Sequence, residues 1–85
     1  MMIHNLEICE NYVEPILAKE KNFDIRINDK EFQKGDYINY TEHSATTGQN
    51  NKNRLKDKIF KITYVHSGYG LEKDFVILGF KEIVE

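Results

Sequence analysis

Three charged residues lie close together in the sequence, and their types suit the binding of a polar or anionic ligand. They are Lys21, Asp24 and Arg26. Asp24 and Arg26 stand two positions apart in a segment that alternates apolar and polar residues, which predicts a strand. Both side chains would then lie on one face, about 7 Å apart, with Lys21 reaching over from the preceding turn. A carboxylate between two cations holds them in place and leaves donors for a phosphate, a carboxylate or a base edge. The same spacing also fits a solvent-exposed strand face with a weak ion pair.

Two further residues are candidates for contact with the same ligand. Tyr69 lies in a glycine-flanked turn, where its ring offers a face for stacking on a base. His4 lies on the first predicted strand, where we expect it to border the site or to be satisfied by a backbone carbonyl. The three histidines lie on separate segments without metal-ligand spacing, so the sequence predicts no metal site. No cofactor is indicated.

The length and composition of the chain limit the classes of protein to consider. Its 85 residues, 40% hydrophobic and 31% charged, fit one globular domain over residues 1–85. The net charge of −2 disfavours extended coating of nucleic acid, so we expect a compact site that reads one or two bases, with a shallow salt dependence. The single Cys9 excludes an internal disulfide, and no apolar run is long enough to span a membrane. We therefore expect a cytoplasmic protein.

The hydrophobic pattern predicts five strands and one short helix. The strands are expected around residues 3–8, 23–27, 37–40, 60–64 and 75–80, and the helix from about Glu10 to Glu20, with Pro15 in its first turn or two. The last strand is apolar on both faces and should be central. The polar loop over residues 43–54 is expected to be the most mobile part. Gly35 and Asp36 are expected to form a tight turn in which the aspartate accepts backbone hydrogen bonds.

This order of elements predicts an α+β fold that is mainly β. We expect a small curved sheet of about five strands, closed toward a barrel, with the helix after the first strand at one end. The residues expected to supply much of the core are Phe23, Ile25, Ile27, Phe60, Ile62 and Phe75. That core leaves the polar side of the second strand facing solvent.

Five segments of the chain match one family pattern, namely residues 4–8, 21–29, 32–36, 63–64 and 70–71. Together they resemble the ASCH group of the PUA-like superfamily, above all its small uncharacterised members found in phages and Gram-positive bacteria. Asp24 stands for the usual Glu, Asn22 for Thr, and Lys19 for a Gly, although a lysine resists the positive φ that glycine permits. The positions that match the family pattern are Lys21, Arg26, Asn28, Asp29, Phe32, Gly35 and Asp36.

The resemblance implies a PUA-like β-barrel with a cleft between barrel and helix, lined by Lys21, Asp24 and Arg26. Such a cleft would bind RNA or a modified nucleotide, with His4 and Tyr69 as further contacts. We therefore expect a binding module without a metal, a cofactor or a membrane.

Two alternatives stay open. In an amidohydrolase acting on a modified nucleoside such as N4-acetylcytidine, Lys21 would match the family's catalytic lysine, but Asp24 occupies the position of its threonine. A phage-type domain that binds a protein partner is the other alternative, since a fold does not fix a function. An exposed apolar patch away from the cleft would support it.

Overall fold

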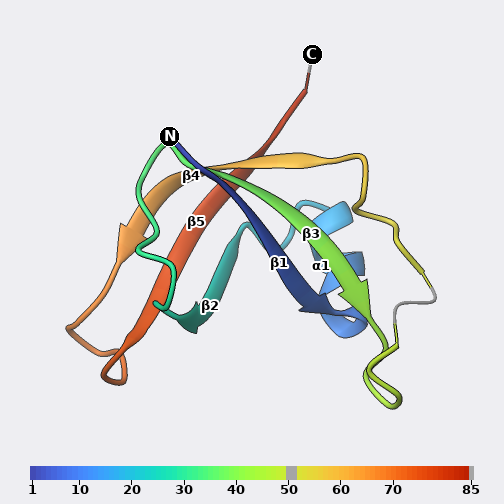
Figure 1. Ribbon diagram of the computed structural model, residues 1–85, viewed down its shortest axis with the longest axis horizontal. Helices are drawn as coiled ribbons and strands as arrows, with labels where there is room; N and C mark the ends of the chain where they lie inside the picture. Colours follow the sequence, from blue (N-terminus) through green and yellow to red (C-terminus); the bar gives the residue numbers. More distant parts are fainter. Residues whose placement is uncertain (50–51, 85) are drawn as a thin grey trace.

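The protein is built on one curved mixed sheet. The computed structural model describes residues 1–49 and 52–84. Its five strands lie in the order β1-β3-β4-β5-β2 and curl into a half-barrel (Figure 1). β1 and β3 are parallel, and the other neighbours are antiparallel. The strands are β1 (Ile3–Cys9), β2 (Phe23–Ile27), β3 (Tyr37–His43), β4 (Ile59–His66) and β5 (Phe75–Ile83). The predicted fold class is confirmed, and β5 lies inside the sheet as expected.

The helical segment between β1 and β2 is shorter than predicted. It consists of a 3-10 turn, η1 (Glu10–Tyr12), and the helix α1 (Val13–Leu17). Val13 and Ile16 are buried against the sheet, and Pro15 stands in the first turn of α1, where its missing amide costs no helical hydrogen bond. The helix lies at one side of the curled sheet (Figure 1).

Lys19 follows α1 in the left-handed conformation, with a φ of 62°. Its amide donates to the Ile16 carbonyl at 3.0 Å, so the turn forms despite the missing glycine. Replacing Lys19 by glycine is expected to raise the free energy of unfolding by about 1 kcal/mol, because glycine adopts a positive φ without steric cost. Urea denaturation measures the change. Lys19→Ala keeps the Cβ and should give no gain, so equal stability of the two variants would contradict the argument.

The core lies on the inner side of the curl and draws on every strand except β2 for its apolar residues. Its aromatic centre is formed by Tyr40, Phe60 and Phe80, whose ring centroids are 5.0 to 6.1 Å apart. Phe60 and Ile62 are buried as predicted. Phe75 is only half-buried, so its predicted place in the core is wrong.

β2 faces the opposite way from the prediction. Phe23, Ile25 and Ile27, expected in the core, are 40%, 49% and 54% exposed. Asp24 is buried instead, and Arg26 is half-buried. The alternation correctly divides β2 into an apolar and a polar face, but the prediction that the apolar face lies inside is wrong. The polar face lies inside because its side chains find hydrogen-bond partners there.

Two other strands differ from the prediction in detail. In β1 the inner face begins with His4 rather than Ile3, which explains the break in the apolar alternation at its start. In β4 a register shift against β5 falls between Ile62 and Tyr64. This bulge leaves Tyr64 65% exposed, although strict alternation from Phe60 and Ile62 would turn it inward.

The Gly35-Asp36 turn ties the start of β1 to β3 and β4. Gly35 has a φ of 96° and donates its amide to the Ile62 carbonyl at 2.8 Å. The Asp36 carboxylate accepts hydrogen bonds from the amides of Met2 and Gln33 and from His4 Nε2 at 2.8 Å. Burial raises the pKa of Asp36, but these bonds outweigh it and hold the pKa below its ordinary value. The predicted structural role of the turn is confirmed.

The polar loop after β3 is anchored at its far end. Arg54 Nη2 lies 2.6 Å from Glu42 and its Nη1 lies 2.7 Å from Glu14. Hydrogen bonds from Arg54 lower the pKa of the buried Glu42. The next residue, Leu55, is fully buried. Part of the predicted loop, residues 50–51, lies outside the described residues, and its mobility stays a prediction.

Candidate functional site

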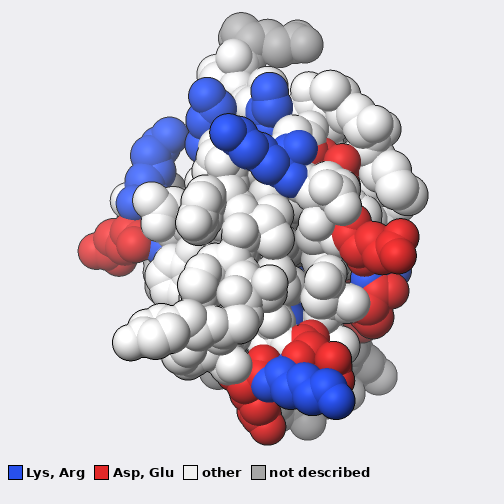
Figure 2. Space-filling model, turned by 90° about the vertical axis from the view of Figure 1, so that its left-hand side faces the viewer, with Lys and Arg blue, Asp and Glu red and all other residues white. Residues whose placement is uncertain are grey.

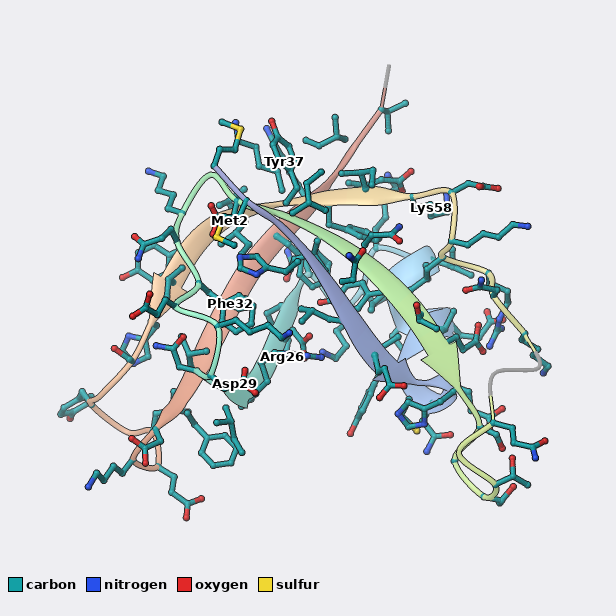
Figure 3. The ribbon with its side chains drawn as sticks, in the orientation of Figure 1. Met2, Arg26, Asp29, Phe32, Tyr37 and Lys58 are labelled. Carbon is teal, nitrogen blue, oxygen red and sulfur yellow. The ribbon has the colours of Figure 1, made fainter. Side chains whose placement is uncertain are left out.

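A hydrogen-bond network joins the two edge strands of the sheet. Asp24 Oδ2 accepts from the Tyr40 hydroxyl at 2.7 Å and from Arg26 Nε at 3.0 Å. Arg26 Nη2 donates to the Glu7 carbonyl of β1 at 2.9 Å, so the side chain spans the space between β2 and β1 (Figure 3). Burial and the neighbouring Asp24 raise the pKa of Tyr40, so its hydroxyl stays protonated and donates the hydrogen bond to Asp24. These partners explain why the polar face of β2 points inward.

A small pocket lies beside this network, between η1 and β2. Its volume is about 230 Å³. That is below the roughly 300–1,000 Å³ typical of small-molecule sites, so it suits one planar ring system better than a large ligand. The residues that line it are Tyr12, Lys21, Phe23, Asp24 and Ile25.

Lys21 stands between two aromatic rings in this pocket. Its Nζ lies 5.1 Å from the ring centroid of Tyr12 and 4.5 Å from that of Phe23, within range of cation–π attraction. The ammonium donates to the Phe23 carbonyl, which uses one of its three donors. Burial lowers the pKa of Lys21, while the charge of Asp24 opposes the shift. A lysine with a shifted pKa in a pocket is a candidate for function.

Asp24, which also lines the pocket, has one carboxylate oxygen without a partner among the described residues. Its Oδ2 is used by Tyr40 and Arg26, whereas Oδ1 accepts no hydrogen bond from any described residue. Within residues 1–49 and 52–84, no buried side-chain nitrogen or oxygen lacks a partner, so Oδ1 has access to solvent. The lining of the pocket therefore includes two aromatic residues, a cationic residue and a carboxylate residue.

The structure brings together three of the five predicted site residues. Lys21 and Asp24 line the pocket, and Arg26, which does not line it, donates a hydrogen bond to Asp24. Tyr69 is 95% exposed in the turn between β4 and β5, where its carbonyl accepts from a nearby histidine, and it does not line the pocket. His4 is buried at the Asp36 turn, with a carboxylate rather than a backbone carbonyl as its partner.

Sequence reasoning missed the two aromatic walls of the pocket. The spacing of Tyr12 from Val13 and Ile16 puts all three on one side of the predicted helix, but Tyr12 is 50% exposed. Phe23 was assigned to the core. One signal was available: Phe23 immediately precedes Asp24 and follows Lys21 by two positions, so an inward Asp24 turns Phe23 outward to the side of the lysine.

The described residues contain no group of three or more His, Cys, Asp or Glu side chains that could hold a metal ion. In the same part of the chain, none of the helical segments has the length and apolar character needed to cross a membrane.

Comparison with known proteins gives one family and a similar fold. The family model described as "Domain of unknown function (DUF3850)" matches residues 3–80, a span that contains every residue of the pocket. No curated protein matches the chain. The crystal structure of the hypothetical protein PH0355 is similar, with a TM-score of 0.61 and 15% identity over 98% of this chain and 100% of that chain. At this identity the similarity shows a shared fold alone.

Proposed function

This chain belongs to the DUF3850 family, whose description assigns no function, and we propose that it is a binding module for RNA or a nucleotide. The observation that carries the proposal is the pocket between η1 and β2, whose lining brings together two exposed aromatic residues, the Lys21 ammonium and the carboxylate residue Asp24. Aromatic faces stack on bases whatever their identity, and charged groups beside them bind phosphates and base edges.

Each group has a distinct role in this proposal. A base stacks on Tyr12 and Phe23, where the Lys21 ammonium lies in the free protein. The lysine side chain then turns to the phosphate with its remaining donors. Asp24 Oδ1 accepts from an amino or imino group of the base. Arg26 does not line the pocket, and it acts on the ligand through the hydrogen bond that positions the Asp24 carboxylate.

The resemblance to the ASCH group supports this reading, because that resemblance also assigns Lys21, Asp24 and Arg26 to a nucleotide cleft. The amidohydrolase alternative has less support. One oxygen of Asp24 is already held by Tyr40 and Arg26, and among the residues lining the pocket only Tyr12 carries a hydroxyl. The pocket lining therefore lacks the threonine hydroxyl on which the family's mechanism depends.

Loss of the Lys21 charge is expected to weaken RNA binding. Lys21→Gln should cost roughly 1.5–3 kcal/mol of binding free energy, about 10- to 100-fold in Kd, as for a lost hydrogen bond to a charged group. Titration of nucleoside monophosphates and short single-stranded RNA against both proteins measures the change. The control is Lys73→Gln, which removes the same charge from the exposed turn between β4 and β5 and should bind as the wild type does. Equal affinities of Lys21→Gln and Lys73→Gln for RNA would exclude the pocket as the binding site.

One observation favours a protein-interaction function as the second candidate. The outward side chains of β2 form an exposed apolar strip on an edge strand, flanked by Phe75 and Ile77 of β5 as cross-strand partners. The face drawn in Figure 2 has a broad uncharged area below a group of basic side chains. Edge strands of two copies can pair around a two-fold axis, so a second copy is the partner to test. Self-association in sedimentation that Ile25→Lys abolishes would favour this candidate.

A further inference from the structure

Three hollows of the surface adjoin one another and share lysine residues. The first is the pocket between η1 and β2, to which Lys21 belongs. The second, of about 210 Å³, has Lys19, Lys21 and Lys81 around a floor of Ile16, Phe60 and Phe80. The third, of about 360 Å³, is lined by Lys34, Gly35, Lys61, Ile62, Thr63 and Lys81. Lys21 lines the first and second hollows and Lys81 lines the second and third, so the three hollows are neighbours on the surface.

The fold, and not the sequence, gathers these lysines. Lys61 and Lys81 are direct cross-strand partners on β4 and β5. Lys34 joins them because the following residue, Gly35, donates its amide to the carbonyl of Ile62. Like charges directly opposite each other on a sheet destabilise it. The arrangement is thus unfavourable for the free protein and favourable for an anion that bridges the side chains.

The lysines that line the hollows are not neutralised by the protein. Within the described part of the chain, Lys19, Lys34, Lys61 and Lys81 form no ion pair. The one carboxylate in the middle hollow, Glu82, lies 3.3 Å from Lys58 and is already paired. Figure 2 shows Lys and Arg side chains gathered at the top of one face. In a chain with a net charge of −2, this is a local excess of positive charge.

We propose that five lysines bind the phosphate backbone of a single-stranded RNA whose base occupies the pocket. These residues, named here the lysine path, are Lys19, Lys21, Lys34, Lys61 and Lys81. The inference rests on the proposed function and extends it from a nucleotide to a strand. Ammonium groups spread along a groove suit the successive phosphates of a strand, because a single small anion could not reach all five lysines. With five phosphate contacts at about 0.7 each, the salt dependence of binding should have a slope of about 3.5, steeper than the net charge indicates.

The test compares a dinucleotide with a single-stranded RNA of about ten nucleotides, within the length that such grooves cover. Both are titrated at several salt concentrations against the wild type, Lys61→Gln/Lys81→Gln and the control Lys30→Gln/Lys73→Gln. The longer RNA should bind the wild type more tightly than the dinucleotide. The Lys61→Gln/Lys81→Gln variant should lose about tenfold or more in affinity for it, and its salt slope should fall by about 1.4, or 0.7 for each phosphate contact removed. Its affinity for the dinucleotide should be unchanged.

The failures of the two proposals are distinguishable. Equal affinity for both RNAs, with no effect of Lys61→Gln/Lys81→Gln, would overturn the lysine path and leave the pocket intact. Absence of binding to either RNA would overturn the proposed function and the path together. A polyglutamate peptide of matched charge serves as a competitor. If it displaces the longer RNA as well as unlabelled RNA does, the path is a surface for acidic proteins and the inference is wrong.

Discussion

Replacing Phe60 by alanine is expected to lower the free energy of unfolding by about 3–5 kcal/mol, a large share of the stability of so small a domain. Phe60 is 3% exposed, and its ring packs 5.0 Å from that of Phe80 and 5.7 Å from that of Tyr40. Truncation would leave a cavity in the aromatic centre, which the strands on either side cannot close.

Urea denaturation of the two proteins measures this loss. The matched control is Tyr64→Ala on the same strand, because the bulge leaves Tyr64 exposed and its truncation should cost about 0.5 kcal/mol or less. An unchanged denaturation midpoint for Phe60→Ala would show that β4 has a different register from the one described.

Replacing Arg26 by alanine is expected to cost about 2–3 kcal/mol of stability, in addition to any effect on binding. Removing one partner of a fully buried ion pair costs about 3–5 kcal/mol, and partial exposure reduces that figure. The side chains of Arg26 and Asp24 are 23% and 10% exposed. The variant would leave Asp24 with Tyr40 alone and would remove the bond to the Glu7 carbonyl between the edge strands.

A double-mutant cycle isolates this interaction. Asp24→Ala and the Asp24→Ala/Arg26→Ala double variant are unfolded beside Arg26→Ala, and the double variant should lose less than the sum of the single changes. A solvent-exposed face of β2 with a weak ion pair, as expected from the sequence, would allow Arg26 to be removed without loss of stability. An Arg26→Ala variant as stable as the wild type would support that earlier expectation and contradict the network.

The sequence predicted the elements well because local patterns determine them. The five strands, the short helix with Pro15 near its start and the turn at Gly35 and Asp36 all follow from periodicity and turn chemistry within a few residues. What local patterns could not predict was which face of β2 lies inside. Asp24 is satisfied there by Tyr40, 16 positions away, and Arg26 by Glu7, 19 positions away.

The candidate site shows the same limit. Lys21, Asp24 and Arg26 were identified from their types and spacing, and the structure places them together. Tyr12 lies in the 3-10 turn η1 and not in the single longer helix that was expected, and its ring contacts Lys21. The bulge that exposes Tyr64 likewise depends on pairing with β5, which no local alternation records.

The central claim is that the pocket between η1 and β2 binds a nucleotide, and amide NMR during titration with a short single-stranded RNA tests it most directly. The account predicts saturable shifts at Tyr12, Lys21 and Asp24, with Ile27 and Ile77 on the apolar strip unchanged. Shifts confined to Ile27 and Ile77, or no shifts at millimolar RNA, would contradict it.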